Sequence, residues 1–401
     1  MRKLAFLTLI LVGISAQAQI ALVGKAVDSE TGESLPFASV SLQGRSISTI
    51  TNLDGEFEFH ISNQNRNDIL VISMLGYKNY EAPVWSIISP NTMIIRMEKS
   101  STMLDELVIS DSLSASEILN IALSKMRQNY PMKPFIMDGF YRDVKKVANT
   151  NISLLEAAVK IYDENYLKPR NQYKLRENVQ LVEVRRSLGY ESKFTSYFDQ
   201  ENLLEDLLLH NDVRYYQIPT EDAFHNGLVR ETNTFYDKNE VFVIGHNKDY
   251  HLKIYVDTKT YGILFLNFES HVSYDDQRKK GMISRFVYVK REIAFRKFEE
   301  KLYLNYISMV SRINWYDIVT NDLKFETELS QQLLINNVET NTRKRISSSK
   351  SMRNYGLQYQ HQVYNKEFWD NYNVIKRTPL DKKIIEDLER AGPLEEQFND
   401  N

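Results

Sequence analysis

Apolar and polar residues alternate in short runs over the first hundred positions of the chain. Residues 36–42 (PFASVSL) and 56–61 (EFEFHI) place an apolar side chain at nearly every second position, and residues 68–74 are largely apolar. Turn residues such as Asp54-Gly55 interrupt these runs every ~8–12 residues, a spacing typical of the strands of a β-sandwich. The pattern therefore predicts a β-sandwich over residues 19–100.

Longer runs with the same alternation occupy residues 228–338 and predict an antiparallel meander. The expected strands cover residues 240–246, 251–257, 263–271, 283–291, 293–298, 301–311 and 324–335. Two further strands are expected earlier, at 135–143 and 152–162, although the second also fits a helix. The expected fold class is mainly β, with the sandwich followed by a larger antiparallel sheet or open-barrel domain over residues 117–340.

A few helices are expected to cover this sheet. Ser114 or Ser116 can cap a helix that runs to about residue 129, and the segment at 202–210 (NLLEDLLLH) predicts a second, short helix. Polar residues at 101–116 indicate a linker between the domains. Polar residues also begin the segment 341–401, which we expect to be a loop followed by a helical tail, with its last helix near 381–390.

The N-terminus has the pattern of a secretory signal. Arg2 and Lys3 precede an apolar run over residues 4–14, and Ala16-Gln17-Ala18 is an A-x-A cleavage site, so residues 1–18 are expected to be a signal peptide. No later segment reaches the ~18 consecutive apolar residues of a membrane-spanning helix. We therefore expect an exported protein, located in the periplasm, associated with the outer membrane or secreted.

Composition narrows the classes of function. The chain has no cysteine, which excludes disulfides, cysteine nucleophiles, Cys-ligated metals and a lipoprotein anchor at the mature N-terminus. Its 50 basic and 53 acidic residues give a net charge of -3, without the excess of positive charge that marks a nucleic-acid-binding protein. The basic residues at 165–200, Arg185 and Arg186 among them, are expected to lie on a solvated surface.

Three segments of the predicted sandwich resemble a known domain. GKAVDSETGESLPFASVSLQG, TNLDGEFEF and ILVISMLGYKNY, at residues 24–44, 51–59 and 69–80, resemble the carboxypeptidase-regulatory-like domain, a transthyretin-like β-sandwich. This domain occurs beside carboxypeptidases and at the front of TonB-dependent receptors of Bacteroidota. The resemblance implies an accessory module without catalytic activity.

Two weaker resemblances bear on the rest of the chain. Residues 103–109 (MLDELVI) look like the segment that leads into the plug of those receptors, but the remaining chain is too short for a plug and a receptor barrel of roughly 600 residues. The turn at 257–262 (DTKTYG) and the spacing of its strands are similar to the open, half-closed barrel of periplasmic lipoprotein carriers. This second resemblance implies a cleft for a lipid or lipoprotein.

The sequence offers no recognisable catalytic, cofactor-binding or metal-binding constellation. None of the seven histidines is followed by Glu three positions later, as a zinc carboxypeptidase would require, and the chain has no G-x-S-x-G, P-loop or dinucleotide-binding glycine pattern. His246 and His251 are the closest candidates for a metal pair, but we expect them to be exposed residues of a turn. We therefore predict no cofactor and no enzymatic activity.

The remaining candidate site is an apolar cleft. Phenylalanines of the predicted meander either fill an ordinary core or line a cleft covered by the two helices, and they are Phe265, Phe268, Phe286, Phe295 and Phe298. The expected function is binding or assembly at the envelope, with an envelope protein, a glycan or a lipid as partner. A lipid or lipoprotein carrier is the alternative, and an unrecognised hydrolase of peptides or glycans is a third possibility.

The linker generates a testable prediction. Asp111-Ser112-Leu113 resembles the acceptor of the O-glycosylation system of exported Bacteroidota proteins, although Asp111 or Ser112 can also simply precede the helix cap. We expect the protein from its native host to begin at Gln19 and to carry a glycan on Ser112, which an intact-mass measurement detects. A mass equal to that of the bare mature chain, unchanged by Ser112→Ala, would reject the glycan.

Overall fold

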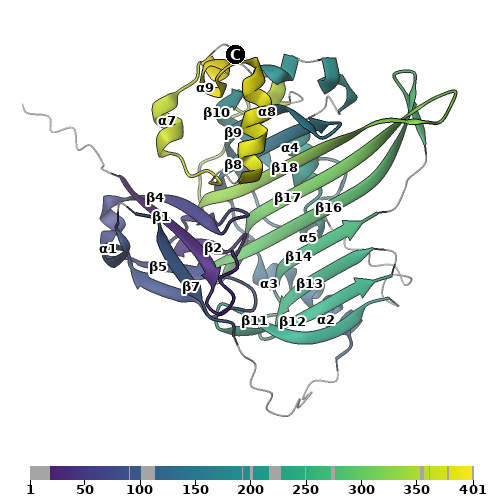
Figure 1. Cartoon of the computed structure of the whole chain (residues 1–401). Helices are drawn as coiled ribbons and strands as arrows, with labels where there is room; N and C mark the ends of the chain where they lie inside the picture. Colours follow the sequence, from purple (N-terminus) through teal and green to yellow (C-terminus); the bar gives the residue numbers. More distant parts are fainter. Residues whose placement is uncertain are drawn as a thin grey trace, which may run out of the picture.

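The structure is a computed structural model that describes residues 19–89, 91–100, 113–191, 193–198, 202–215, 227–248, 250–271, 276–352, 356–360, 362–376 and 379–399. The expected signal peptide and most of the expected linker, including Ser112, lie outside the described residues. A small sandwich sits against a large curved sheet (Figure 1). The expected mainly β class is confirmed, and the large sheet does not close into a barrel.

The sandwich consists of a three-stranded and a four-stranded sheet, ordered β4-β1-β7 and β3-β2-β5-β6. Its elements are β1 (Gln19–Asp28), β2 (Ser39–Leu42), β3 (Ser48–Ile50), β4 (Glu56–Ser62), η1 (Asn63–Asn67), β5 (Ile69–Ser73), β6 (Tyr80–Pro83), α1 (Val84–Ile87) and β7 (Met93–Met97). The alternation predicted for β4 is present, because Phe57 and Phe59 are buried between the sheets. Gly55 directly precedes this strand at φ +74°, and a Cβ there would lie 2.3 Å from the carbonyl oxygen of Ala26, so the Asp54-Gly55 turn requires glycine.

The large sheet has eleven antiparallel strands, ten of them in the order β10-β9-β8-β18-β17-β16-β14-β13-β12-β11. Its strands are β8 (Phe135–Val147), β9 (Thr150–Asp163), β10 (Asn178–Arg186), β11 (Val229–Tyr236), β12 (Asn239–Asn247), β13 (His251–Asp257), β14 (Ile263–Ser270), β15 (Gln277–Lys279), β16 (Met282–Phe298), β17 (Lys301–Asp317) and β18 (Leu323–Glu339). The prediction of separate strands at 283–291 and 293–298 is wrong. β16 continues through both, and irregularities at Phe286/Tyr288 and Ala294/Phe295 absorb the breaks in alternation.

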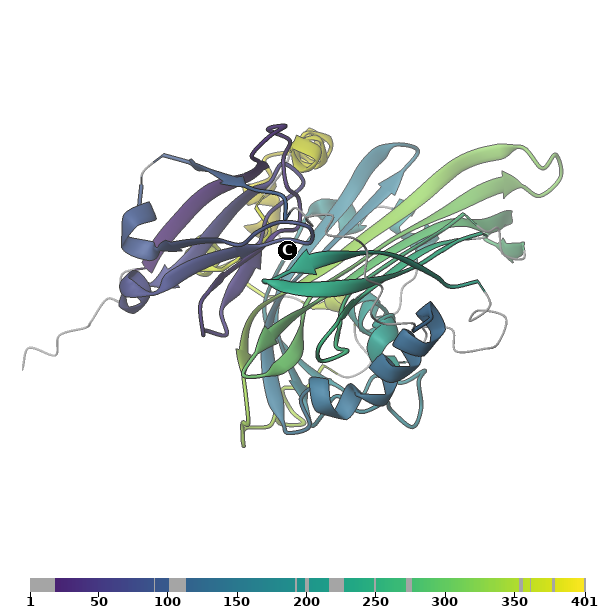
Figure 2. The same cartoon turned by 90° about the horizontal axis from the view of Figure 1, so that it is seen from below.

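Helices fill the concave side of the curved sheet (Figure 2). They are α2 (Ala115–Ser124), α3 (Met126–Asn129), α4 (Leu203–Leu209) and α5 (Asp212–Tyr215), accompanied by the short 3-10 segments η2 (Leu188–Glu191) and η3 (Lys193–Tyr197). Ser114, one of the two expected caps, begins α2 with a capping box in which Glu117 bonds back to it. Ile118 and Leu119 of α2 are buried against the strands, as the helical periodicity predicts, and Leu207 of α4 is buried with them.

The opposite face of the sheet is covered by the sandwich and by the C-terminal segment, coloured yellow in Figures 1 and 2. This segment contains η4 (Leu357–Tyr359), α7 (Lys366–Asn371), α8 (Pro379–Leu388), η5 (Glu389–Ala391) and α9 (Leu394–Asn399). Trp369, Leu388 and Phe398 are buried against β8 and β9. None of the helices in the described residues is long and apolar enough to cross a membrane.

Phe37 is an aromatic side chain of the sandwich that packs against the sheet. The ring of Phe37 stacks on Tyr306 of β17, with 5.5 Å between centroids and 24° between planes. Phe37 adopts φ +59°, a conformation that costs a non-glycine residue about 1–2 kcal/mol. Thr51 holds this turn, because its carbonyl accepts the N–H of Phe37 and its hydroxyl accepts the N–H of Ala38 and donates to Leu35. The backbone is therefore fixed in the orientation that points the ring at the sheet.

Side-chain hydrogen bonds reinforce this contact. The hydroxyls of Ser46 and Ser48 donate to the amide oxygens of Asn337 and Asn305, at 2.6 and 3.1 Å. In the C-terminal segment, the side-chain amide of Asn373 accepts from the backbone N–H of His60 at 2.7 Å and donates to its carbonyl at 3.0 Å. This bond pair occupies part of the outer edge of β4 and attaches the sandwich to the C-terminal segment.

We predict that Phe37→Ala lowers the free energy of unfolding of the mature chain by about 2 kcal/mol, about half the loss typical of a fully buried phenylalanine. Alanine keeps the Cβ and the backbone strain, so the change isolates the contribution of the ring. The measurement is chemical denaturation followed by circular dichroism. The control is Trp85→Ala, an aromatic residue of the same sandwich that is 57% exposed, and equal effects of both substitutions would contradict the prediction.

Candidate functional site

The five phenylalanines proposed to line one cleft are distributed over several sites. Phe265 and Phe295 line one cavity, whereas Phe286 lines a second pocket and Phe298 borders a third, polar groove. Phe268 packs against Tyr250 and lies under the guanidinium of Arg291, 4.6 Å from its carbon. Only Phe265 and Phe295 thus border the same cavity, and the ring of Phe295 packs on the concave side against Tyr130 and Tyr166.

The junction cavity lies between the sandwich and the outer face of the sheet and has a volume of about 170 Å³. Phe37 and Ile50 contribute from the sandwich, and Phe265, Phe295 and Tyr306 contribute from the sheet. The polar residues in its wall include Glu292 and Ser39, and the buried hydroxyl of Ser39 has no hydrogen-bond partner among the described residues. The cavity is therefore a mainly apolar space with polar groups in its wall.

The inner pocket lies on the concave side, between α4 and strands β16 to β18, and has a volume of about 210 Å³. Phe286, Met309 and Leu329 form apolar parts of its wall, and Asp206 and His210 stand on the helical side. The Nδ1 atom of His210 lies 2.8 Å from the carbonyl oxygen of Asp206. The expected cover by the helix at 202–210 is found here, but only Phe286 of the expected lining reaches this pocket.

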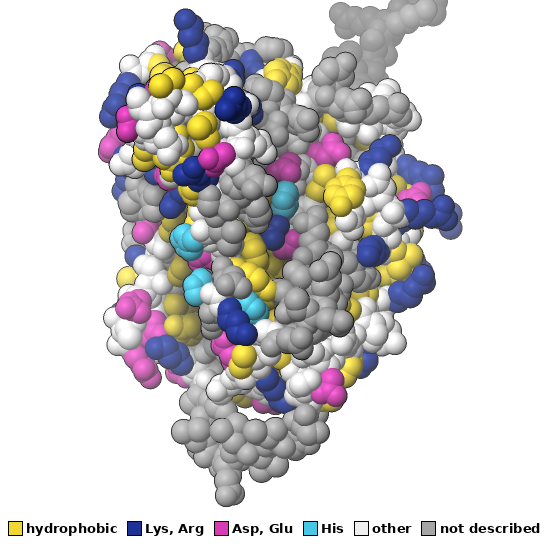
Figure 3. Space-filling view, turned by 90° about the vertical axis from the view of Figure 1, so that its right-hand side faces the viewer, with side chains coloured by type: hydrophobic (Ala, Val, Ile, Leu, Met, Phe, Trp, Pro, Cys, Tyr) yellow, Lys and Arg dark blue, Asp and Glu magenta, His cyan; other side chains and the backbone are white. Residues whose placement is uncertain are grey.

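The two histidines considered as a metal pair point to opposite faces of the sheet. His246 lies opposite Leu252 in the β12–β13 pairing, so the two share a face, and His251 follows on the other face. His251 is exposed as expected, but the expectation of an exposed turn is wrong for His246, which lies within β12 at 5% exposure with its ring stacked 4.2 Å from Tyr250. Histidine side chains gather around a hollow with apolar side chains on the face shown in Figure 3.

Within the described residues, no group of three or more His, Asp or Glu side chains is arranged to hold a metal ion. Several of the buried acidic side chains are instead paired with arginines. Glu156 is fully buried in the outer face of β9, 2.7 Å from Arg142 and 2.6 Å from Arg185. Arg185 also lies over the ring of Trp369 at 4.2 Å, which attaches the C-terminal segment.

Arg185 and Arg186 correct the expectation of a solvated basic surface. Arg185 is partly buried and forms an ion pair with the buried Glu156, and Arg186 is buried and donates to the carbonyl of Gln358. Acidic and basic residues are interleaved in this part of the sequence, and that pattern is typical of a solvated surface. The acidic partner of Arg185 is on β9, and the partner of Arg186 lies 172 residues away.

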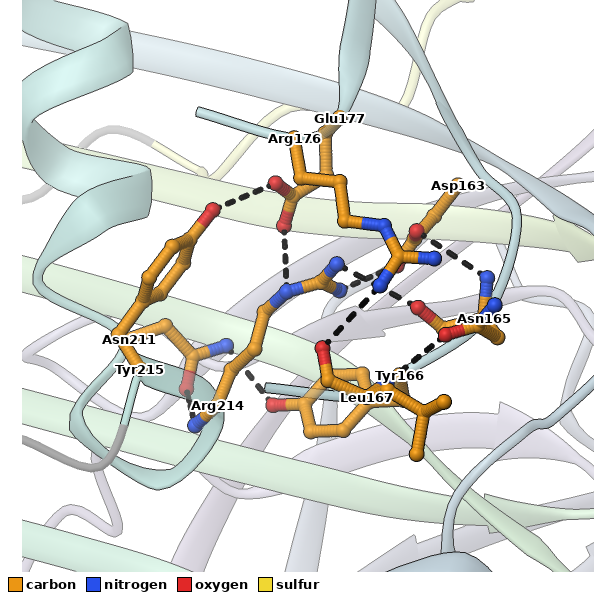
Figure 4. A network of polar contacts seen from close by, with 9 residues as sticks. All are labelled: Asp163, Asn165, Tyr166, Leu167, Arg176, Glu177, Asn211, Arg214 and Tyr215. Atoms are coloured by element: carbon orange, nitrogen blue, oxygen red, sulfur yellow. Dashed lines mark hydrogen bonds and ion pairs between the residues drawn. The ribbon is translucent and has the colours of Figure 1, made fainter. Parts of the chain in front are cut away.

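A second buried ionic cluster lies on the concave side and was not predicted from the sequence (Figure 4). Arg214 of α5, only 1% exposed, forms ion pairs with Asp163 and with Glu177, the latter at 3.2 Å. The hydroxyl of Tyr215 donates to Glu177 at 2.7 Å. Asn211 donates to the hydroxyl of Tyr166 at 2.9 Å. These contacts tie α5 to the end of β9 and to the segment before β10.

The cluster contains two carboxylates and one guanidinium. Burial raises the pKa of Glu177, and the charge of Arg214 opposes that rise. The neighbouring carboxylates in turn hold the pKa of Arg214 above its ordinary value in spite of burial. The arginine thus permits two acidic side chains to remain inside the domain, and its loss would leave both without a counter-ion.

Comparison with known proteins assigns the small domain. Residues 22–109 match the family model of the CarboxypepD_reg-like domain. The N-terminal sandwich is a carboxypeptidase-regulatory-like domain. A curated relative, the TonB-dependent receptor SusC of Bacteroides thetaiotaomicron, is 33% identical over 100 residues, which are 25% of this chain and 9% of the receptor. The regulatory-like domain model covers less than a quarter of the chain and leaves the larger domain unassigned.

Solved structures show only slight likeness to the chain. One of them is a domain from Vibrio parahaemolyticus that is described as an outer membrane lipoprotein-sorting protein. It is 14% identical, with 58% of this chain and 95% of that chain covered and a TM-score of 0.23. MucB in its complex with MucA from Pseudomonas aeruginosa is 9% identical, with 56% and 98% covered and a TM-score of 0.18. At these TM-scores the likenesses do not bear on function.

We predict that Arg214→Met destabilises the mature chain by about 3–5 kcal/mol at pH 7, because two buried carboxylates lose their counter-ion. The folded state of the variant binds protons more readily than the unfolded state, since the raised pKa of Glu177 rises further without Arg214. Its stability therefore falls as pH rises above the ordinary glutamate range. The difference in the free energy of unfolding between the variant and the wild-type chain should be smaller at pH 5 than at pH 7.

Urea denaturation at the two pH values measures this difference. The matched control is Arg45→Met, which removes the ion pair between Asp68 and the 55%-exposed side chain of Arg45. Water screens that pair, so a much smaller and pH-insensitive loss is expected. A gap for Arg214→Met that widens at pH 5 would contradict the sign of the linkage.

Proposed function

We propose that the protein is a non-catalytic binding or assembly protein of the bacterial envelope. Two sequence features support the location: the signal-like N-terminus and the N-terminal domain of a type shared with a TonB-dependent receptor. The matched model describes a regulatory-like domain rather than a peptidase domain. This supports a role in which the sandwich presents a surface and does not perform a reaction.

The outer strand β7 of the sandwich is the observation that carries this proposal. β7 ends the three-stranded sheet in the order β4-β1-β7, and Ile94 at its outward face is 60% exposed. The other edge strand, β4, is already occupied in part by Asn373. An exposed edge strand pairs readily with an extended segment of another protein, so β7 is the proposed partner-binding edge.

The alternative function is a lipid or lipoprotein carrier. The inner pocket supports it through its apolar wall at Phe286 and Met309. However, the helices of the chain fill most of the concave side, and the cavities of about 170 and 210 Å³ are smaller than the ~300–1,000 Å³ typical of small-molecule sites. The geometry thus favours binding through surfaces over carriage of a ligand in the interior.

Photo-crosslinking in the native envelope tests the two functions. With benzoylphenylalanine at Ile94, we expect a discrete protein adduct, and the same group at the 92%-exposed Val363, which lies outside any strand of the C-terminal segment, should give none. Native mass spectrometry of the same protein detects bound lipid. A bound lipid that is lost in Phe286→Ala, together with no adduct at Ile94, would overturn the binding role in favour of the carrier.

A further inference from the structure

Two β-hairpins end side by side at one end of the large sheet. The first joins β15 to β16 through Lys280 and Gly281, and the second joins β17 to β18 through residues 318–322. Met282 of the first pairs with Asp317 of the second, so their ends are neighbours. In Figure 1 the green ends of these long strands reach farther from the sandwich than the other strands of the sheet.

The β17–β18 hairpin carries apolar side chains into solvent. Ile318, Val319 and Leu323 are 42%, 86% and 56% exposed. The turn that carries them is fixed, because the carboxylate of Asp317 accepts the N–H groups of Val319 and Thr320 at 2.9 and 3.1 Å. These side chains are thus held outward in one conformation, so they lose little conformational entropy when a binding partner or a membrane buries them.

The β15–β16 hairpin places positive charge next to this apolar tip. Arg278, Lys279 and Lys280 are consecutive and exposed, and in the described part of the chain Arg278 and Lys279 form no ion pair. Residues 276–285 and 317–324 together carry five basic and three acidic side chains.

The acidic side chains of this end are mostly neutralised. Asp276 is held by Arg285 through two hydrogen bonds of 2.6 and 2.7 Å, and Asp317 lies 3.3 Å from Lys324. Asp322, exposed on the apolar turn, is the remaining carboxylate of the two hairpin ends. The end of the sheet is therefore positively charged around a small apolar tip.

We propose that these two hairpin ends dock the protein on a bilayer of anionic phospholipid. Ile318 and Val319 insert among the headgroups, while Arg278, Lys279 and Lys280 contact lipid phosphates. The apolar tip consists of only three exposed side chains, whereas each partner of a stable protein interface contributes ~800 Å², and a fluid lipid surface needs no complementary pocket. This inference goes beyond the proposed binding role and rests on different residues.

The cysteine-free sequence makes a direct test possible. The mature chain with Val319→Cys, labelled with an environment-sensitive dye, should show a blue shift with vesicles of phosphatidylglycerol and phosphatidylcholine and little with phosphatidylcholine alone. The control is Val363→Cys, an apolar position of the C-terminal segment that is 92% exposed, which should show no shift. A dye at 319 that does not respond to anionic vesicles, or responds equally to both kinds, overturns the proposal.

Vesicle cosedimentation tests the charge contribution. A basic side chain near an anionic bilayer strengthens binding about fivefold, so replacing Arg278, Lys279 and Lys280 by Gln should weaken binding at least about tenfold. The matched control replaces the basic triplet at 343–345 by Gln, in which Lys344 and Arg345 already face Glu339 and Glu164, and it should change binding less than about threefold. Unchanged thermal unfolding verifies that each variant is folded, and equal losses for both triplets overturn the proposal.

Discussion

The central strands of the large sheet are buried on both faces, and the rest of the structure follows from this constraint. In β8 and β9 almost every position is shielded, so neighbouring residues such as Phe140 and Tyr141 are both fully buried although they point in opposite directions. A sheet of this kind cannot stand alone in water. The chain covers one face with the helices α2 to α5 and the other with the sandwich and the C-terminal segment.

Charged side chains specify how these covers attach. Glu156 on the outer face and Asp163 on the inner face are both completely enclosed, and each is paired with arginine. A buried ion pair adds little net stability compared with apolar packing, but breaking it is costly. The arginines thereby discriminate against other dockings, because a shifted helix or tail would leave a carboxylate buried without a counter-ion.

Local patterns in the sequence predicted the individual strands, turns and helix caps better than the contacts between these elements. The Asp54-Gly55 turn, the Ser114 cap and the alternation in β4 depend on neighbours in the chain, and they were expected correctly. The ionic cluster at Arg214 joins residues up to 51 positions apart, and no local sequence pattern predicts it. The phenylalanines of the expected cleft were misgrouped for the same reason: alternation assigns a residue to a face but does not say which element covers that face.

The strain at Phe37 shows how the two domains are adapted to each other. A residue with positive φ persists where its surroundings hold it in place, and here Thr51 bonds the turn while Tyr306 stacks on the ring. Thr51 belongs to the sandwich and Tyr306 to the sheet, so both domains contribute contacts to this strained turn. The small domain therefore acts as a fixed part of one body rather than as a freely hinged module. Because the centre of the sheet is enclosed by its own chain, both proposed binding surfaces lie at the periphery: the outer strand β7 on the sandwich and the hairpin ends at the far end of the sheet.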